Sequence, residues 1–199
     1  MKALLKKIMI GLILIFIVSE VYAQRQIKNK QHNQPVLVNQ KMPDSLQDFK
    51  FKDSLDRNVS ISDFRGKYLV LDLWYSGCGA CIHVNEGLRK VHDRLKDKNI
   101  VFISISIDKT KEMWMLGITK DTKPSRINNW AGRYWPAPGT VCLYTGGSGS
   151  ANSFINKYVP DNAYPELILV DPEGIVIANT LPRPDDDPNL LINYLEQFL

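Results

Sequence analysis

The sequence contains two cysteines three positions apart, Cys78 and Cys81, where an apolar run ends and an amphipathic pattern begins. A thiol at the N-terminus of a helix is well placed to form the thiolate, which is the species that attacks a disulfide. The first cysteine would be exposed at the helix start and attack, and the second, one turn further in and partly covered, would resolve the mixed disulfide. The pair therefore predicts thiol–disulfide exchange with Cys78 as nucleophile and Cys81 as resolving thiol.

Three other interpretations of the cysteine pair compete with redox chemistry: a structural disulfide, a zinc half-site and chance spacing. A disulfide that closes so short a loop adds little stability through chain entropy. A zinc site needs two more ligands, and the sequence has no second Cys-x-x-Cys and no paired histidines. A copper site built from Cys78, Cys81 and His83 is a further alternative, as in a copper-chaperone-like module. The exchange reaction itself needs no cofactor and no metal.

Asp72 lies six residues before Cys78 and is the single charged residue in the run Tyr68–Trp74. A carboxyl group in an apolar strand is costly to ionise, so its pKa should rise. Such a carboxylate is suited to accept the proton of Cys81 when that thiol has to attack. The alternative is a carboxyl that is satisfied by a hydroxyl group or by Lys67.

Four further side chains are candidates for a role in or around the site. Cys142 is interpreted as a small buried apolar residue, because free cysteine is among the most buried residue types; a third redox role is the alternative. His83 is expected to be an exposed residue of the helix. Trp74 and Tyr75 are expected to wall the site by packing.

The elements that must position these residues can be identified from hydrophobic periodicity. Tyr68–Trp74 is typical of a strand buried on both faces, and a helix follows from Cys78 to about Leu95. Alternation and turn residues indicate hairpins over Phe49–Ile61 and Glu166–Ala178, strands over Ile100–Asp108 and Val141–Tyr144, and a loop over 146–150. Helical spacing indicates a helix over 110–118, with Met113, Trp114 and Ile118 on its apolar side, and a helix over 151–158. Asp187 and Pro188 open a last helix, whose apolar side consists of Leu190, Leu191, Tyr194, Leu195 and Phe198.

The N-terminus has the layout of a secretory signal peptide. Three lysines precede the uncharged apolar run Ile8–Val18, and the small residue Ala23 follows at a suitable cleavage position. The run is about half as long as the ~20 apolar residues of a spanning helix, so cleavage is predicted and an uncleaved anchor is the alternative. Loss of residues 1–23 removes three lysines and one glutamate, which changes the formal charge from +4 to +2 and gives no support to nucleic-acid binding.

The rest of the chain is predicted to form one domain. Residues 24–40 are rich in Gln, Asn and Lys and are expected to be a flexible lead-in. Residues 41–199 are long enough for a single core, and no internal repeat is visible.

The segment from Asp72 through Trp74 to Cys78 and Cys81 resembles the active-site segment of the thioredoxin superfamily. The lead Phe64–Lys67, the preceding hairpin, the signal peptide and a larger middle insertion make the chain similar to the exported TlpA/ResA-like branch. The resemblance covers about residues 41–199. It implies an α/β, thioredoxin-like three-layer fold, in which helices flank a mixed central sheet that carries an N-terminal β-hairpin and a middle insertion.

The resemblance also implies a cis-proline loop that faces the cysteines. Pro165, preceded by Tyr164, stands at that place, and an ordinary trans proline at a strand start is the alternative. The loop would present the Tyr164 backbone to a substrate chain, with Trp74 beside it. Two departures leave the redox potential open: Ala80 replaces the proline usual between the cysteines, and Gly77 stands where an aromatic residue is common.

The function implied by the resemblance is that of a periplasmic thiol–disulfide oxidoreductase. Its substrates would be protein disulfides, its electrons would come from a membrane thiol donor, and it would act as a monomer. A disulfide-forming oxidase or isomerase of the same fold is the alternative, and a metal-binding module is the alternative from another class. A peroxiredoxin-like peroxidase is disfavoured, because residues 71–78 lack the Thr/Pro-x-x-x-Thr/Ser-x-x-Cys setting of that family.

Overall fold

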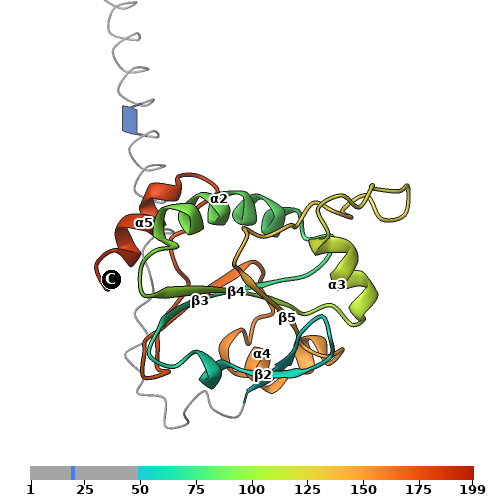
Figure 1. The fold of residues 1–199 in the computed structure, drawn as a ribbon. Helices are drawn as coiled ribbons and strands as arrows, with labels where there is room; N and C mark the ends of the chain where they lie inside the picture. Colours follow the sequence, from blue (N-terminus) through green and yellow to red (C-terminus); the bar gives the residue numbers. More distant parts are fainter. Residues whose placement is uncertain (1–18, 21–48) are drawn as a thin grey trace, which may run out of the picture. The chain divides into compact units, whose positions relative to one another are not determined.

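A seven-stranded mixed sheet lies at the centre of the computed structural model, with helices on both of its faces (Figure 1). The structure describes residues 19–20 and 49–199, and residues 49–199 all belong to one compact unit. Apart from Ser19 and Glu20, the predicted signal peptide and lead-in lie outside the described residues. Within the described part of the chain, no helix is both long enough and apolar enough to cross a membrane.

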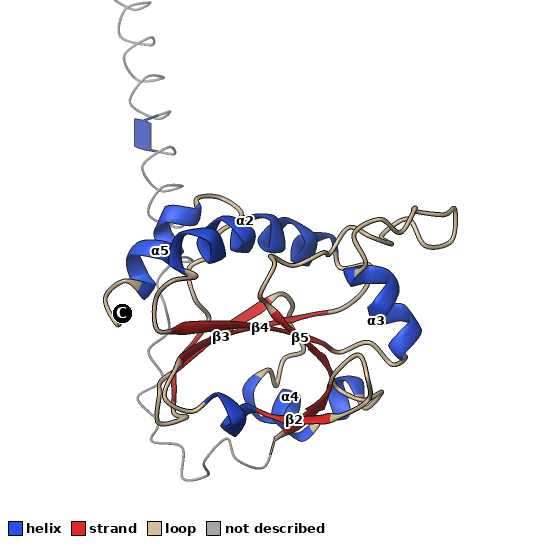
Figure 2. Ribbon diagram, viewed as in Figure 1, coloured by secondary structure: helices blue, strands red, loops and turns tan. Residues whose placement is uncertain are grey.

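The strand order in the sheet is β2-β1-β5-β4-β3-β6-β7. Figure 2 shows β3, β4 and β5 side by side at its middle. Three parallel strands form its middle, and the strands at both edges run antiparallel to their neighbours. The strands are β1 (Lys50–Lys52), β2 (Asn58–Ser60), β3 (Tyr68–Trp74), β4 (Ile100–Ser106), β5 (Val141–Tyr144), β6 (Glu166–Val170) and β7 (Val176–Asn179). The predicted α/β class and mixed sheet are confirmed, and so are both predicted hairpins.

The central strand β3 is buried on both faces, as its apolar run predicts. Leu69, Leu71 and Leu73 pack against the short helix α4 (Ser153–Tyr158) on one face. Val70 packs on the other face, against α2 (Gly79–Leu95) and α5 (Pro188–Leu195). Figure 2 shows these helix layers on the two sides of the sheet. Because side chains alternate along a strand, Asp72 and Trp74 share the face that α2 covers.

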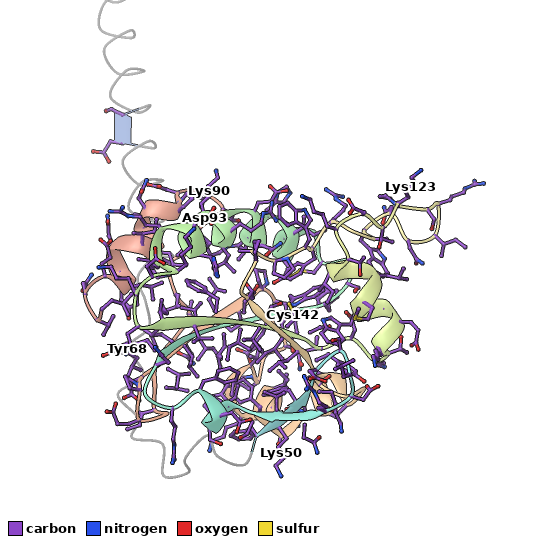
Figure 3. All side chains as sticks on the ribbon, viewed as in Figure 1. Lys50, Tyr68, Lys90, Asp93, Lys123 and Cys142 are labelled. Atoms are coloured by element: carbon purple, nitrogen blue, oxygen red, sulfur yellow. A yellow bond between two sulfur atoms is a disulfide. The ribbon has the colours of Figure 1, made fainter. Side chains whose placement is uncertain are left out.

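The middle insertion is built around α3 (Lys111–Ile118), which Thr110 caps. Residues 119–140 contain no helix or strand; they form a long excursion beyond α3, and Lys123 lies near its far end (Figure 3). Two single-turn 3-10 helices complete the fold, η2 (Ile61–Phe64) and η3 (Gly149–Ala151).

The apolar sides predicted for two helices were wrong at one residue each. Met113 of α3 and Leu190 of α5 are exposed, whereas their neighbours Trp114 and Leu191 are fully buried. Both exposed residues lie in the first turn of their helix, and successive residues point about 100° apart, so a residue next to a buried one can face solvent.

Candidate active site

The cysteine pair lies at the N-terminus of α2, where β3 passes into the helix. Gly77, with a φ of +86°, turns the chain, and Cys78 is the N-cap residue. Cys78 and Cys81 form a disulfide with their Cα atoms 5.2 Å apart. The backbone N–H of Cys81 donates to Cys78 Sγ at 3.1 Å, so the sulfur takes the place of the usual capping oxygen. A negative charge on Cys78 Sγ would be stabilised by the same donor and by the helix N-terminus.

Both sulfurs are more enclosed than the sequence suggests. Cys78 is 6% exposed and Cys81 is 1% exposed, so the order of exposure is as predicted but Cys78 itself is buried. The cover comes from distant segments, since Trp130 and Tyr164 both pack against the cluster that contains the two cysteines. Trp130 lies directly over Gly77: a Cβ there would be 3.5 Å from Trp130 Cδ1. The indole thus covers a place where Gly77 has no side chain.

The loop before Cys78 is held by Asp108, a residue that sequence reasoning missed. The carboxylate is 4% exposed and accepts hydrogen bonds from the Ser76 N–H (3.0 Å), the Ser76 hydroxyl (2.8 Å) and the Ser106 hydroxyl (2.7 Å). These bonds tie the loop to the end of β4. The sequence signal was Ser106 and Asp108, which stand at the end of an apolar strand and just beyond it.

Asp72 is 5% exposed and lies under α2. Its Oδ2 accepts a hydrogen bond from the Tyr134 hydroxyl, and its Oδ1 is buried with no hydrogen-bond partner among the described residues. Burial raises the pKa of the Asp72 carboxyl to about 7, and the Tyr134 hydrogen bond opposes that rise. The expected upward shift is therefore present. The alternative of a satisfying hydroxyl is realised for one oxygen only.

Tyr134 is held in place by Trp74. The two rings stack with their centroids 3.5 Å apart and an interplanar angle of 10°, and Trp74 Nε1 donates to Ser104 Oγ at 2.8 Å. Burial and the neighbouring Asp72 raise the pKa of Tyr134 well above its usual value, so the hydroxyl stays a donor. Trp74 is fully buried and supports this arrangement from within; it has no free surface to offer a substrate, contrary to the predicted contact.

Pro165 lies directly before β6, and the Tyr164–Pro165 peptide bond is cis, as the resemblance implies. Tyr164 packs against the cysteine cluster and meets Tyr75 edge to face, with ring centroids 5.8 Å apart. Tyr75 is exposed, so it walls the site at the surface. We call Tyr75, Trp130 and Tyr164 the aromatic rim.

Cys142 and His83 contribute less to the site. Cys142 is half-buried on β5 (Figure 3), and its thiol donates to the Thr140 carbonyl at 3.6 Å. Burial raises the pKa of Cys142 to about 11, which keeps the thiol protonated at neutral pH. His83 is exposed, with Nδ1 3.8 Å from Glu86 Oε2. Within residues 19–20 and 49–199, no three His, Cys, Asp or Glu side chains gather as metal ligands would.

The chain matches a family model and resembles several solved structures. The model of the AhpC/TSA family matches residues 38–179. The thioredoxin domain of a thiol-disulfide oxidoreductase from Bacteroides vulgatus is 26% identical, with 80% of this chain and 99% of that chain covered and a TM-score of 0.58. A thiol:disulfide interchange protein from Bacteroides sp. is 26% identical over 75% of this chain and 84% of that chain, with a TM-score of 0.56.

A more distant structure shares the fold. A thiol-disulfide oxidoreductase from Bacteroides fragilis is 24% identical over 78% of this chain and 100% of that chain, with a TM-score of 0.58. These likenesses confirm the predicted thioredoxin-like fold.

Proposed function

Because the chain belongs to the AhpC/TSA family, we propose that its Cys78–Cys81 couple reduces disulfide bonds of proteins outside the cytoplasm. Family, fold and cysteine pair together make the protein a thiol–disulfide oxidoreductase. The observation that supports attack by Cys78 is the hydrogen bond from the Cys81 N–H to Cys78 Sγ at the start of α2. That donor favours a thiolate on Cys78 in the reduced protein, which makes Cys78 the attacking group.

The first step is attack by Cys78. Its thiolate displaces one sulfur of the substrate disulfide, so the substrate S–S bond breaks while a Cys78–substrate bond forms. The displaced sulfur leaves with the electron pair and takes a proton from solvent. The product is a mixed disulfide between Cys78 and the substrate chain.

The second step is resolution by Cys81. The thiol gives its proton to the Asp72 carboxylate, and the resulting thiolate attacks Cys78 Sγ. The Cys78–Cys81 bond forms, the mixed disulfide breaks, and the substrate leaves with two electrons as a thiolate. A carboxyl group with a pKa of about 7 suits this task, because at neutral pH it accepts a proton readily and also gives it back.

The loop at Tyr164 and Pro165 is proposed to hold the substrate chain. It borders the cysteines together with the exposed ring of Tyr75. Apolar rings around a buried sulfur favour an extended, unfolded segment as substrate, because such a segment can bring its disulfide close to Cys78. The aromatic rim would then close over the mixed disulfide.

The proposed electron source is a membrane thiol protein that reduces the Cys78–Cys81 disulfide by the same exchange in reverse. Export rests on the signal-peptide layout of residues 1–23, and periplasmic location follows from export. The protein is proposed to act as a monomer, without a cofactor.

Substitution of the cysteines tests this function. Cys78→Ser should abolish reduction of insulin disulfides by the protein, and Cys81→Ala should accumulate a mixed disulfide on Cys78 that mass spectrometry detects. Cys142→Ser is the matched control and should retain full turnover. Turnover by Cys78→Ser, or an adduct on Cys142, would overturn the assignment.

The direction of electron flow needs a separate measurement. Potentials of this fold run from about −270 mV for a reductase to about −120 mV for a strong oxidant. We expect the Cys78–Cys81 couple, equilibrated with glutathione or dithiothreitol buffers, to lie near the reducing end. A value near the oxidising end would favour the disulfide-forming alternative.

A further inference from the structure

A small cavity lies between the sheet and α2, behind the redox centre. Its volume is about 20 Å³, which is room for a single water molecule. Its lining includes Asp72 of β3, Ser104 of β4, and Asn85 and His92 of α2. The cavity is thus partly polar, as a site for an ordered water must be.

Two of these lining residues have a buried polar atom without a partner. Asp72 Oδ1 and His92 Nδ1 make no hydrogen bond within the described residues. Buried polar atoms are nearly always hydrogen-bonded, to protein or to ordered water. A water in this cavity would satisfy both atoms, because it can donate to one and donate to or accept from the other.

The face of α2 over the cavity begins at the redox pair. Asn85 follows Cys81 by four residues and His92 follows Asn85 by seven, so the three side chains lie along one stripe of the helix. At the far end of the stripe His92 is 8% exposed, and its ring lies beside Gly139, where a Cβ would be 3.6 Å from Nε2. Gly139 is exposed, so His92 stands between the cavity and the outside.

We propose that one water in this cavity joins Asp72 to His92, and that His92 passes the proton of the resolution step to solvent. The inference rests on the proposed function. The proton moves from the Cys81 thiol to Asp72, from the Asp72 carboxyl to the water, and from the water to His92 Nδ1, and Nε2–H then releases a proton to solvent. No electrons move in this relay. The route leaves at the back of the site, because the substrate covers the front during resolution.

The charged and titratable groups around the relay are compatible with proton transfer from Asp72 to His92. Burial lowers the pKa of His92, Lys96 lowers it further and Asp93 opposes the change, so the ring is neutral at neutral pH and free to accept a proton. The groups that face the two ends of the relay are Tyr134 from the excursion, Cys142 from β5, and Arg89, Asp93 and Lys96 from α2.

The experiment measures attack and resolution separately. The reduced full-length protein is mixed with a disulfide peptide, quenched in acid at intervals, and analysed by mass spectrometry for the mixed disulfide. His92→Gln keeps a hydrogen-bonding side chain but cannot carry a proton. We expect attack at the wild-type rate and resolution slowed about tenfold at pH 7 to 8, at the low end of proton-transfer effects.

Two further variants make the outcome decisive. His92→Ala should be equally slow and should recover with added imidazole, which a purely structural role would not allow. His83→Gln, on the same helix, is the matched control and should resolve at the wild-type rate. Wild-type resolution by His92→Gln, or a slow His92→Ala that imidazole leaves slow, would overturn the relay. Neither result would touch the Cys78 assignment, which the insulin assay tests.

Discussion

Two buried carboxylates flank the redox pair, and they differ in how their oxygens are satisfied. Asp108 accepts hydrogen bonds from the Ser76 N–H, the Ser76 hydroxyl and the Ser106 hydroxyl. Asp72 accepts one, from Tyr134, and its second oxygen has no partner among the described residues. Both side chains are at most 5% exposed, so burial alone does not separate them.

The difference separates a structural carboxylate from one suited to proton transfer. Asp108 accepts hydrogen bonds from three donors that tie Ser76 to the end of β4, so it acts as a fixed clamp on the loop before Cys78. Asp72 lacks this support, so burial raises its pKa to about 7. A buried carboxylate near a cysteine is therefore informative about chemistry only once its donors have been counted.

The largest predicted effect is on the pH dependence of stability. Burial raises the folded-state pKa of Asp72 above its value in the unfolded chain, so the folded protein binds the proton more tightly. The stability from this group is fully present below about pH 4 and is lost as pH rises towards 7. The difference between these pKa values corresponds to roughly 4 kcal/mol. Asp72→Asn should remove this contribution in urea titrations at pH 4 to 8. If the free energy of unfolding varied with pH in the variant as it does in the wild type, Asp72 would not be the group responsible.

Removal of the clamp should cost slightly less. Asp108→Ala leaves the buried Ser76 N–H without an acceptor and removes the carboxylate acceptor of two hydroxyls, so we expect a loss of roughly 3 kcal/mol in the free energy of unfolding at pH 7. The Ser76 hydroxyl keeps its hydrogen bond to the Met113 carbonyl. Urea unfolding monitored by circular dichroism measures it. A loss no larger than for an exposed control, Asp121→Ala, would show that Asp108 is not a clamp.

Tyr134→Phe tests the single hydrogen bond that Asp72 accepts. It removes the one hydrogen bond that favours ionised Asp72, so the pKa of that carboxyl should rise further. We expect the pH midpoint of mixed-disulfide resolution to move up by about one unit, as loss of one such hydrogen bond implies. Tyr68→Phe, at the other end of β3, serves as control and should leave the midpoint in place.

The smallest effect is expected for Ser76→Ala. It deletes one donor to Asp108 and leaves the backbone N–H and Ser106 in place. The free energy of unfolding should fall by about 1 kcal/mol. A loss as large as that of Asp108→Ala would mean that the hydroxyl alone holds the loop.

Sequence patterns predicted most of what lies in regular elements. β3, α2, the cysteine pair and Asp72 follow from an apolar run, a helical period and residue types that can exchange protons and electrons. The cis bond at Pro165 could be anticipated only by resemblance.

The parts that sequence reasoning missed come from the excursion 119–140 and from a loop end. Tyr134 pairs with Asp72 across 62 positions, and Trp130 covers Gly77 from the same excursion. Residues 119–140 follow no strand or helix period, so their sequence does not indicate which side chains face the core. Asp108 pairs with Ser76 across 32 positions. Such contacts depend on tertiary packing, so no local pattern encodes them.

The role of Asp72 as proton acceptor is tested most directly by the rate of mixed-disulfide resolution as a function of pH, in the wild type and in Asp72→Asn. The wild-type rate should rise with a midpoint near pH 7, as Asp72 ionises and becomes able to accept the Cys81 proton. Asp72→Asn should lack that rise and resolve at least tenfold more slowly at pH 8, within the usual range for loss of a general base. Superimposable pH profiles for the two proteins would show that Asp72 does not accept the Cys81 proton.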